Sequence, residues 1–259
     1  MVLHRTPRGN VFFSHRTGAL REATDACATC GGWNLVSLGI GVERVYDFVS
    51  REATPVFLFT QETVKTHRAA QKLISDFAAS LGGVIIGTER MLPYLPEVEL
   101  SVVASIDSML SRPEWRAEEQ ALSVLFSLTG KTKERMIVET RRPDARVMRA
   151  LSVGGPQDFI REELGERKTY DYPPYALFVS LSWVGTEARV AERKKEVLDA
   201  FRGFDLVGPL PPESLGRGQF RQKAVLRLDP KVWPDQEVVV RVRGLSPDVT
   251  VTVDPDDIV

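Results

Sequence analysis

Residues 55–87 read PVFLFTQETVKTHRAAQKLISDFAASLGGVIIG, and the fold prediction starts from this stretch. Two short runs rich in β-branched and other apolar residues, residues 55–60 and 83–87, are typical of strands. Residues 64–81 between them have the apolar spacing of a helix. A strand, a helix and a second strand in this order predict a βαβ unit with two parallel strands.

The same alternation continues after this unit. Residues 100–106 and 136–140 have the composition of strands, and residues 114–128 between them have helical spacing. Parallel strands joined by helices normally have helices on both faces of the sheet. The sequence therefore predicts an α/β lobe with a parallel sheet over residues 34–170.

A change of pattern after this lobe marks a second domain. Residues 143–170 are helical and strongly charged, and Tyr172-Pro173-Pro174-Tyr175 then ends the helix, because successive prolines cannot continue one. Residues 236–243 have the β-branched content of a strand, yet Asp235 before them and Gly244 after them are typical helix boundaries. Residues 171–259 predict a small α+β domain with a strand, an amphipathic helix and two further strands, at residues 176–184, 187–201, 223–228 and 249–253.

The nearly neutral net charge gives no general attraction to nucleic acid or to a membrane. The 259 residues include 34 Lys and Arg and 35 Asp and Glu, which gives a formal net charge of −1. Any contact with DNA must therefore come from a local basic patch. The longest apolar runs are too short to span a bilayer, and residues 1–5 lack the apolar region of a signal peptide. We expect a cytoplasmic protein without a membrane segment.

The tripeptide Gly130-Lys131-Thr132 resembles the end of a Walker A loop, in which backbone amides and a lysine hold the phosphates of ATP. The complete motif needs a glycine at the position of Leu125, where the spacing is that of a buried helix. A phosphate-binding loop instead follows a strand and opens a helix. We interpret the tripeptide as a helix end followed by a basic turn, and we predict no ATP site and no catalytic residue.

Cys27 and Cys30 form the only CxxC motif in the chain, within residues 1–33, which are expected to be rich in loops. A tetrahedral zinc site needs two more ligands, but Ser14 and Thr17 stand where a second CxxC is expected. His15 is available as a third ligand. Two interpretations stay open: a zinc site that includes Cys27 and Cys30, and a degenerate zinc ribbon in which the two thiols only pack.

Basic and aromatic residues alternate most densely in residues 216–223, GRGQFRQK. Arg217, Arg221 and Lys223 beside Phe220, which we expect to be exposed, predict a contact with a nucleic-acid backbone or with an acidic peptide. The alternative is a solvated basic edge of a β-hairpin. Both interpretations place the segment at the start of a strand.

These segments together resemble the primosomal protein N′ (PriA) family of replication-restart DNA helicases. The Cys27–Cys30 motif and the turn Gly39-Ile40-Gly41-Val42-Glu43 are similar to the end of the zinc region and the return to the motor. Residues 105–119, SIDSMLSRPEWRAEE, carry the most specific match, and Arg116 in this stretch becomes a further candidate for contact with DNA or a partner. The resemblance covers nearly the whole chain.

The resemblance implies the end of a zinc region, a RecA-like second helicase lobe and a C-terminal domain in which residues 236–243 form a helix. The Walker A and Walker B motifs of the family's first lobe are absent. Where many members carry Gly-Arg-Ala-Gly-Arg, this chain has Lys131 and Lys133. Lysine cannot reproduce the planar fork of an arginine finger, so ATP coupling is expected to be degenerate even if a first lobe is supplied.

We therefore expect a PriA-like protein that acts in replication restart by binding, without autonomous helicase activity. The implied partners are branched or single-stranded DNA, the acidic tail of single-strand-binding protein, and primosome proteins. One alternative is the second-lobe subunit of a split helicase, which predicts an apolar patch around Gly39, Gly87 and Asp107. The other is a structural scaffold, which predicts acidic residues over the Arg217 loop.

Overall fold

The computed structural model describes residues 2–6, 9–13, 20–22, 40–112, 114–255 and 258. The chain divides into two compact units, one formed by residues 37–160 and the other by residues 1–36 and 161–259. The division falls within helix α6 (Gln157–Thr169). Each unit has its own architecture and is described separately.

The amino-terminal segment contains three short strands rather than only loops. Strands β1 (Val2–Thr6), β2 (Gly9–Phe13) and β3 (Leu20–Glu22) pair antiparallel in the order β1-β2-β3. The prediction of a loop-rich segment is therefore wrong for these residues. Strands this short carry too few positions for their alternation to stand out in the sequence.

The predicted βαβ unit is confirmed in the unit of residues 37–160. After helix α1 (Val42–Val49), strands β4 (Val56–Phe59) and β5 (Val84–Gly87) pair in parallel and are joined through helix α2 (His67–Ala79). The hydroxyl oxygen of Thr66 accepts a hydrogen bond of 3.2 Å from the N–H of Ala69, so α2 begins with a side-chain cap. The short helix η1 (Glu89–Met91) follows β5.

A second parallel pair completes this lobe. Strands β6 (Val98–Val103) and β7 (Thr132–Val138) are joined through helices α3 (Asp107–Leu110) and α4 (Ala117–Thr129), and α5 (Arg146–Ser152) follows. Ala121 and Leu125 of α4 are fully buried in a core that also contains Ile106 and Val147. The class α/β with parallel strands is confirmed.

Two features of the lobe differ from the prediction. Among the described residues the strands form two separate pairs instead of one continuous sheet. Val103 and Val138 of the second pair pack on the α4 core, whereas Leu100, Val102 and Ile137 on the opposite face are exposed. Helices therefore do not cover both faces of this pair.

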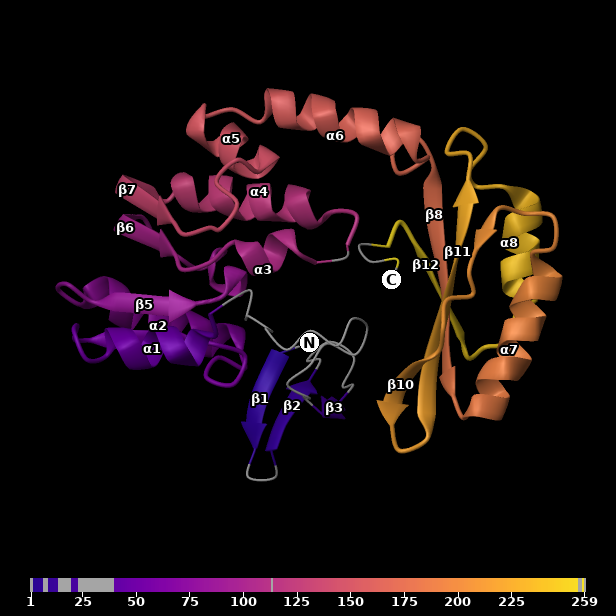
Figure 1. Ribbon diagram of the computed structural model, residues 1–259, viewed down its shortest axis with the longest axis horizontal. Helices are drawn as coiled ribbons and strands as arrows, with labels where there is room; N and C mark the ends of the chain where they lie inside the picture. The colour runs from indigo at the N-terminus through magenta and orange to yellow at the C-terminus, as the bar shows by residue number, and fades with distance from the viewer. Residues whose placement is uncertain are drawn as a thin grey trace. The chain divides into compact units, whose positions relative to one another are not determined.

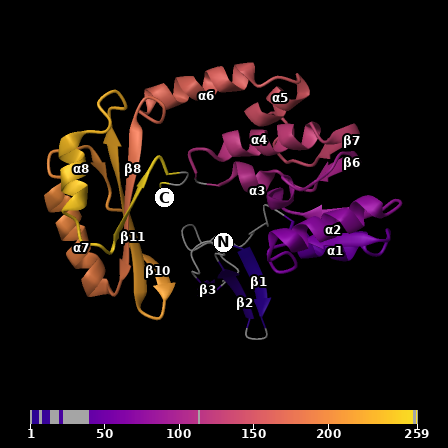
Figure 2. The same ribbon diagram turned by 180° about the vertical axis from the view of Figure 1, so that it is seen from behind.

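The second unit contains a helix-covered antiparallel sheet. Strands β8 (Leu177–Gly185), β11 (Gln219–Leu228), β10 (Glu213–Gly216) and β12 (Val249–Val253) pair in the order β10-β11-β8-β12, and β9 (Leu206–Val207) also pairs with β11. Figures 1 and 2 show α7 (Glu187–Ala200) and α8 (Gln236–Arg243) on the same side of β8, β11 and β12. Val179, Leu181 and Trp183 of β8 pack there against Val197 of α7 and Val238 of α8.

Residues 236–243 form a helix, as the family resemblance implied and against their β-branched composition. The side chain of Asp235 accepts hydrogen bonds from the N–H groups of Glu237 (2.8 Å) and Val238 (3.3 Å), which caps the first turn. Val238 is fully buried in the core. The cap and the buried face outweigh the weak preference of valine for strands.

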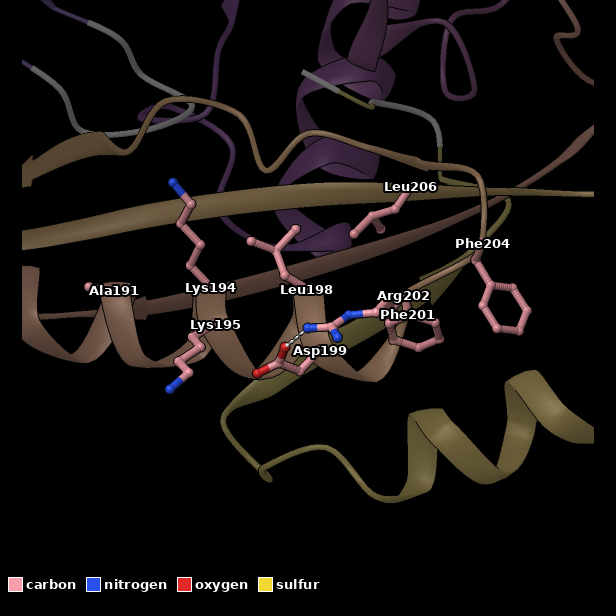
Figure 3. Close-up of a pocket in the computed structure, with 9 residues that line it drawn as sticks. All are labelled: Ala191, Lys194, Lys195, Leu198, Asp199, Phe201, Arg202, Phe204 and Leu206. Atoms are coloured by element: carbon pink, nitrogen blue, oxygen red, sulfur yellow. Dashed lines mark hydrogen bonds and ion pairs between the residues drawn. The ribbon is translucent and has the colours of Figure 1, made fainter.

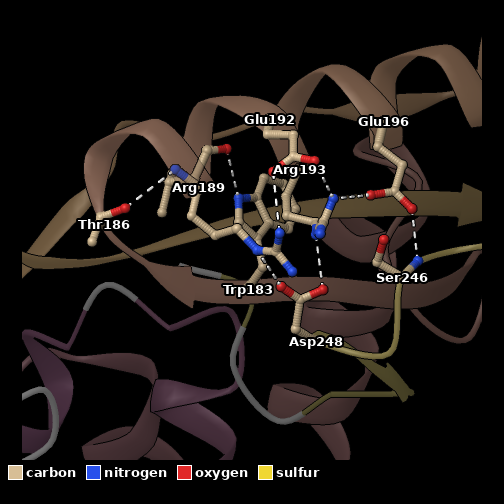
Figure 4. A network of polar contacts seen from close by, with 9 residues as sticks. Trp183, Thr186, Arg189, Glu192, Arg193, Glu196, Ser246 and Asp248 are labelled. Carbon is tan, nitrogen blue, oxygen red and sulfur yellow. Dashed lines mark hydrogen bonds and ion pairs between the residues drawn. The ribbon is translucent and has the colours of Figure 1, made fainter.

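A buried arginine fixes α7 against the loop that precedes β12 (Figure 4). The side chain of Arg193 is 8% exposed and donates hydrogen bonds of 2.8 Å to both Asp248 and Glu196. Glu196 in turn accepts a hydrogen bond from the N–H of Ser246. Burial lowers the pKa of Arg193, but the contacts with Asp248, Glu192 and Glu196 together raise this pKa by more than burial lowers it. The pKa therefore lies above its ordinary value, and the guanidinium stays charged.

Candidate nucleic-acid interface

Successive side chains of a strand point to opposite faces of a sheet, so the core of the second unit defines a face without helices. Val179, Leu181, Ala224 and Leu226 pack under α7 and α8. The intervening residues therefore lie on the other side, called here the helix-free face. They are Phe178, Ser180, Ser182 and Val184 of β8, Arg221, Lys223, Val225 and Arg227 of β11, and Thr250 and Thr252 of β12.

The strand register places cations and hydroxyl groups in the same rows of the helix-free face. Lys223 is opposite Ser182, which is opposite Thr250 on its other side. Arg221, in the next row, is opposite Val184. Cationic and hydroxyl side chains are the groups that contact phosphate oxygens in protein–DNA complexes, so the chemistry of this face suits a nucleic-acid backbone.

The tight hairpin between β10 and β11 displays one more arginine. Gly216, Arg217 and Gly218 all have positive φ angles, 83°, 52° and 72°, a conformation that glycine adopts without strain and arginine rarely adopts. The pairing of the two strands is irregular between Ser214 and Gly216. The side chain of Arg217 is exposed, and no ion pair involves it among the described residues.

The four candidate binding residues of segment 216–223 therefore do not lie on one surface. Arg221 and Lys223 share the helix-free face, and Arg217 stands at the hairpin turn. Phe220 is half-buried and packs against the helix-side core, so the expectation of an exposed aromatic is wrong. The physical reason is strand alternation, which directs Phe220 to the face opposite that of its neighbour Arg221.

Arg227 also lies on the helix-free face but is engaged in an ion pair. Its Nε is 2.9 Å from a carboxylate oxygen of Asp205. Sequence reasoning missed Arg227 and the hydroxyl residues of this face. The alternation Val-Thr-Val-Thr-Val of residues 249–253 was the signal that could have identified the hydroxyl-bearing side.

Arg116 belongs to the other unit and cannot be assigned to this face. Its guanidinium lies 4.3 Å from the ring centre of Trp115, which is a cation–π contact. Arg116 is also the residue before the first turn of α4. Contact of Arg116 with DNA or a partner stays a prediction.

The tripeptide Gly130-Lys131-Thr132 is the end of a helix and the start of a strand, as interpreted from the sequence. Helix α4 ends at Thr129 and β7 begins at Thr132. The ammonium of Lys131 donates a hydrogen bond to the carbonyl oxygen of Leu95, and that of Lys133 is 3.2 Å from a carboxylate oxygen of Glu97. The role of both lysines as a degenerate ATP-coupling region stays a prediction.

Asp107 lies after β6, at the carboxyl end of the parallel strands. Its carboxylate accepts hydrogen bonds from the hydroxyl of Thr140 (2.8 Å) and from the N–H of Arg141 (3.1 Å), which ties the end of β7 to α3. Asp107 is buried and polar, and Gly39 lies outside the described residues. The apolar patch expected around Gly39, Gly87 and Asp107 for a split helicase stays a prediction. Exposed apolar side chains gather at Leu100, Val102 and Ile137 of β6 and β7.

Metal binding by the amino-terminal segment stays a prediction. Cys27, Cys30 and His15 lie outside the residues that the structure describes. Within the described ranges, no group of three His, Cys, Asp or Glu side chains is close enough to hold a metal ion. None of the helices in those ranges has the length and apolar character needed to cross a bilayer.

A shallow hollow of about 600 Å³ lies on the helix-covered side of the second unit (Figure 3). Leu198 of α7 and Leu206 of β9 form part of its apolar lining, and Lys194 and Lys195 stand beside them. No ion pair of either lysine occurs among the described residues, whereas Arg202 pairs with Asp199 at 2.8 Å. The two lysines offer a basic surface on the opposite side from the helix-free face.

A parallel α/β lobe followed by a helix-covered antiparallel sheet defines the fold class, which is consistent with a helicase lobe that precedes a small α+β C-terminal domain. No protein-family model matches the chain. The individual proteins that the chain resembles nevertheless all carry the same name in the comparisons given below. The chain is 24% identical to the replication restart protein PriA of Haemophilus influenzae over 84% of its length, and 23% identical to PriA of Thermotoga maritima over 93%.

The PriA protein of Bacillus subtilis is 24% identical over 88% of the chain. The chain spans only about a third of the length of these relatives, namely 32%, 34% and 30%. The match thus supports a relationship to the C-terminal half of replication restart proteins of the PriA type. This agrees with the resemblance seen in the motifs.

Proposed function

We propose that the protein acts in DNA replication restart, in the cytoplasm, by binding branched or single-stranded DNA through the helix-free face and the Arg217 hairpin. The role follows from the PriA relatives, which carry the name replication restart protein. The observation that supports the binding mode is the row of Lys223, Ser182 and Thr250 beside Arg221. These groups contact phosphates and do not distinguish bases, so we expect binding that is insensitive to sequence and sensitive to salt.

We expect no ATP hydrolysis by this chain alone. Lys131 and Lys133 are engaged with Leu95 and Glu97 at the amino ends of β6 and β7. A separate first helicase lobe would have to supply the phosphate-binding loop before ATP could be used. Other primosome proteins are the remaining proposed partners.

Fluorescence anisotropy with a labelled fork DNA tests the proposal. The double variant R221E/K223E reverses two charges on the helix-free face, and K194E/K195E reverses two on the helix-covered side as the matched control. Since each lost phosphate contact reduces the salt slope by about one unit, we expect R221E/K223E to weaken binding and flatten its salt dependence. The control should bind like the unaltered protein.

Two results would overturn this assignment. Equal losses in the two variants would show that only overall charge matters. No binding of fork DNA by the unaltered protein at low salt would remove the DNA-binding function itself. Thermal unfolding of each variant, measured beside the titration, separates lost binding from lost folding.

A second candidate for the same face is the acidic tail of single-strand-binding protein. The observation that favours it is the pair of cations Arg221 and Lys223 on one face of β11. Carboxylates, like phosphates, are ligands of arginine and lysine. A labelled peptide with that tail sequence should bind the unaltered protein and not R221E/K223E, and unlabelled fork DNA should displace it.

A further inference from the structure

Helix α7 buries one side in the core and leaves a leucine open on the next. Val190 and Val197 are buried in the core of the second unit. Leu198 is instead 40% exposed and lines the hollow of about 600 Å³, together with Leu206 of β9 (Figure 3). Ligand-binding pockets are mostly apolar and have volumes of about 300–1,000 Å³. The hollow therefore offers a place for an apolar side chain of another molecule.

Two phenylalanines complete the apolar lining and are held in place by contacts within the unit. Phe201 is buried, and its ring meets the ring of Phe204 edge to face, with 5.9 Å between the ring centres. The guanidinium of Arg241 in α8 lies 4.9 Å from the ring centre of Phe204. Because these contacts exist without a ligand, a partner does not have to order the two rings when it binds.

The charge around the hollow is positive. Lys194 and Lys195 belong to the lining, and neither forms an ion pair within the part of the chain that the structure describes. The single carboxylate among the lining residues, that of Asp199, is already paired with Arg202 at 2.8 Å. Lys194 and Leu198 are four residues apart, so they lie on the same side of α7. A complementary partner brings negative charge and an apolar group to one place.

This combination favours an acidic peptide over a nucleic acid. Proteins that bind single strands stack the bases on aromatic rings. The most exposed apolar side chain of this lining, Leu198, is aliphatic, and the ring of Phe201 is buried. A peptide that carries carboxylates beside a leucine or phenylalanine can use the lysines and the apolar lining together.

We propose that the hollow between α7 and β9 binds an acidic segment of a partner protein. One large apolar side chain of the segment packs against Leu198 and Leu206, and its carboxylates lie beside Lys194 and Lys195. The apolar contact supplies most of the affinity, and the charges speed association and set the orientation. This function goes beyond DNA binding by the helix-free face and does not depend on it.

A fluorescein-labelled synthetic peptide, in which aspartates flank one leucine and one phenylalanine, is the probe. The same peptide with serine at both apolar positions is its control. Fluorescence anisotropy with the full chain measures the dissociation constants of both peptides. We expect the serine peptide to bind about fivefold more weakly or worse, because the loss of an anchoring side chain at an interface has an effect of about this size.

The apolar contact is tested from the side of the protein with L198A. Leu198 lies outside the core, so the variant should fold, and thermal unfolding checks this. We expect L198A to bind the probe about fivefold more weakly. The matched control is L81A, which shortens a leucine that is 97% exposed in the other unit and should leave the dissociation constant unchanged.

The charges are tested with K194E/K195E. We expect this variant to bind the probe about tenfold more weakly at low salt, because like charges then face each other. The control is R68E/K72E, which reverses two exposed cations of α2 in the other unit and should bind the probe like the unaltered protein. Equal losses in K194E/K195E and R68E/K72E would overturn the proposal, because overall charge would then explain the binding.

Nuclear magnetic resonance locates the peptide directly. The backbone N–H signals of Ala191 and Leu198 should shift when the probe is added to the unaltered protein. Those of Thr250 and Thr252, on the helix-free face, should not. Shifts confined to Thr250 and Thr252 would place the peptide on the wrong side of the sheet and disprove the proposal.

Three further results would disprove it. The first is equal affinity for the probe and the serine peptide, because the apolar lining would then be unused. The second is loss of the probe in R221E/K223E but not in K194E/K195E, which would assign acidic peptides to the helix-free face. The third is a loss of fork DNA and of the probe alike in K194E/K195E, which would make the hollow a general polyanion surface. If the unaltered protein binds fork DNA but not the probe, the hollow has no such ligand and the proposed function stands.

Discussion

At the scale of single residues, the carboxylate of Asp248 determines how the Arg193 network responds to pH. Burial raises the pKa of Asp248, but hydrogen bonds from Arg193 and Arg189 outweigh burial and leave the pKa below its ordinary value. Between the two pKa values the unfolded state binds more protons than the folded state, so stability falls as the pH falls. The contribution is complete at neutral pH and is lost below about pH 4.

We therefore expect D248N to be less stable than the unaltered protein at neutral pH, with a difference that shrinks as the pH is lowered. Thermal unfolding followed by circular dichroism between about pH 7 and about pH 3 measures this difference. The control is D199N, which removes an exposed ion pair with Arg202 at the end of α7, the helix that carries Arg193. A difference that stays constant over the whole range would contradict the assigned pKa direction.

Asp107 gives a second prediction at this scale. Replacing it with alanine leaves the hydroxyl of Thr140 and the N–H of Arg141 without their acceptor. We expect D107A to lose about 1.5–3 kcal/mol of folding free energy, because a hydrogen bond to a charged group contributes about that much and Asp107 itself is buried. D107N keeps one acceptor oxygen and should lose less. Urea unfolding measures the stability of both variants. The control is D76A, at an exposed position of α2, which should be as stable as the unaltered protein. An equal loss of stability in D107A and D76A would show that the hydrogen bonds to Asp107 are not responsible.

At the scale of elements, helix α8 shows where local sequence preference fails. Residues 236–243 carry the valines of a strand, and only the cap at Asp235 and the burial of Val238 make them a helix. The βαβ unit of β4, α2 and β5 was predictable, because its periodicity and its boundaries agree. Strands β1 to β3 were missed because each is too short to show alternation.

The cap of α8 can be tested directly. We expect D235A to lose about 1 kcal/mol of folding free energy, since it removes the acceptor of two backbone N–H groups at the helix start. D235N should retain most of the stability, because asparagine is also a strong cap. Denaturant unfolding distinguishes the two, and equal losses would mean that the charge of Asp235, not its cap, stabilises the helix.

The candidate interface was predictable only in part, also for reasons at this scale. The basic residues of 216–223 were visible in the sequence, but their division between two faces depends on which side α7 and α8 cover. That choice is made by Val190, Val197 and Val238 in tertiary packing. Sequence alternation alone cannot tell the covered face from the helix-free one, and Phe220 was assigned incorrectly for this reason.

At the scale of the whole molecule, residues 171–259, the carboxy-terminal part of the second unit, should fold without the rest of the chain. The main core of this part consists of residues between Val179 and Val249, and its second cluster contains Tyr172 and Ile258. We expect a shortened chain of residues 171–259 to unfold in one cooperative transition and to retain salt-dependent DNA binding. Circular dichroism tests the cooperative unfolding, and fluorescence anisotropy tests the DNA binding. A gradual loss of the circular-dichroism signal without a transition would contradict the expectation.

The enclosure of Arg193 also limits how this protein can diverge. A buried cation deprived of its carboxylate is far more costly than either a complete pair or an apolar replacement of both partners. Mutation one position at a time would therefore pass through poorly folded intermediates. Among distant relatives, the positions of Arg193 and Asp248 should covary: each should retain its charge where the other does, and both should become apolar together.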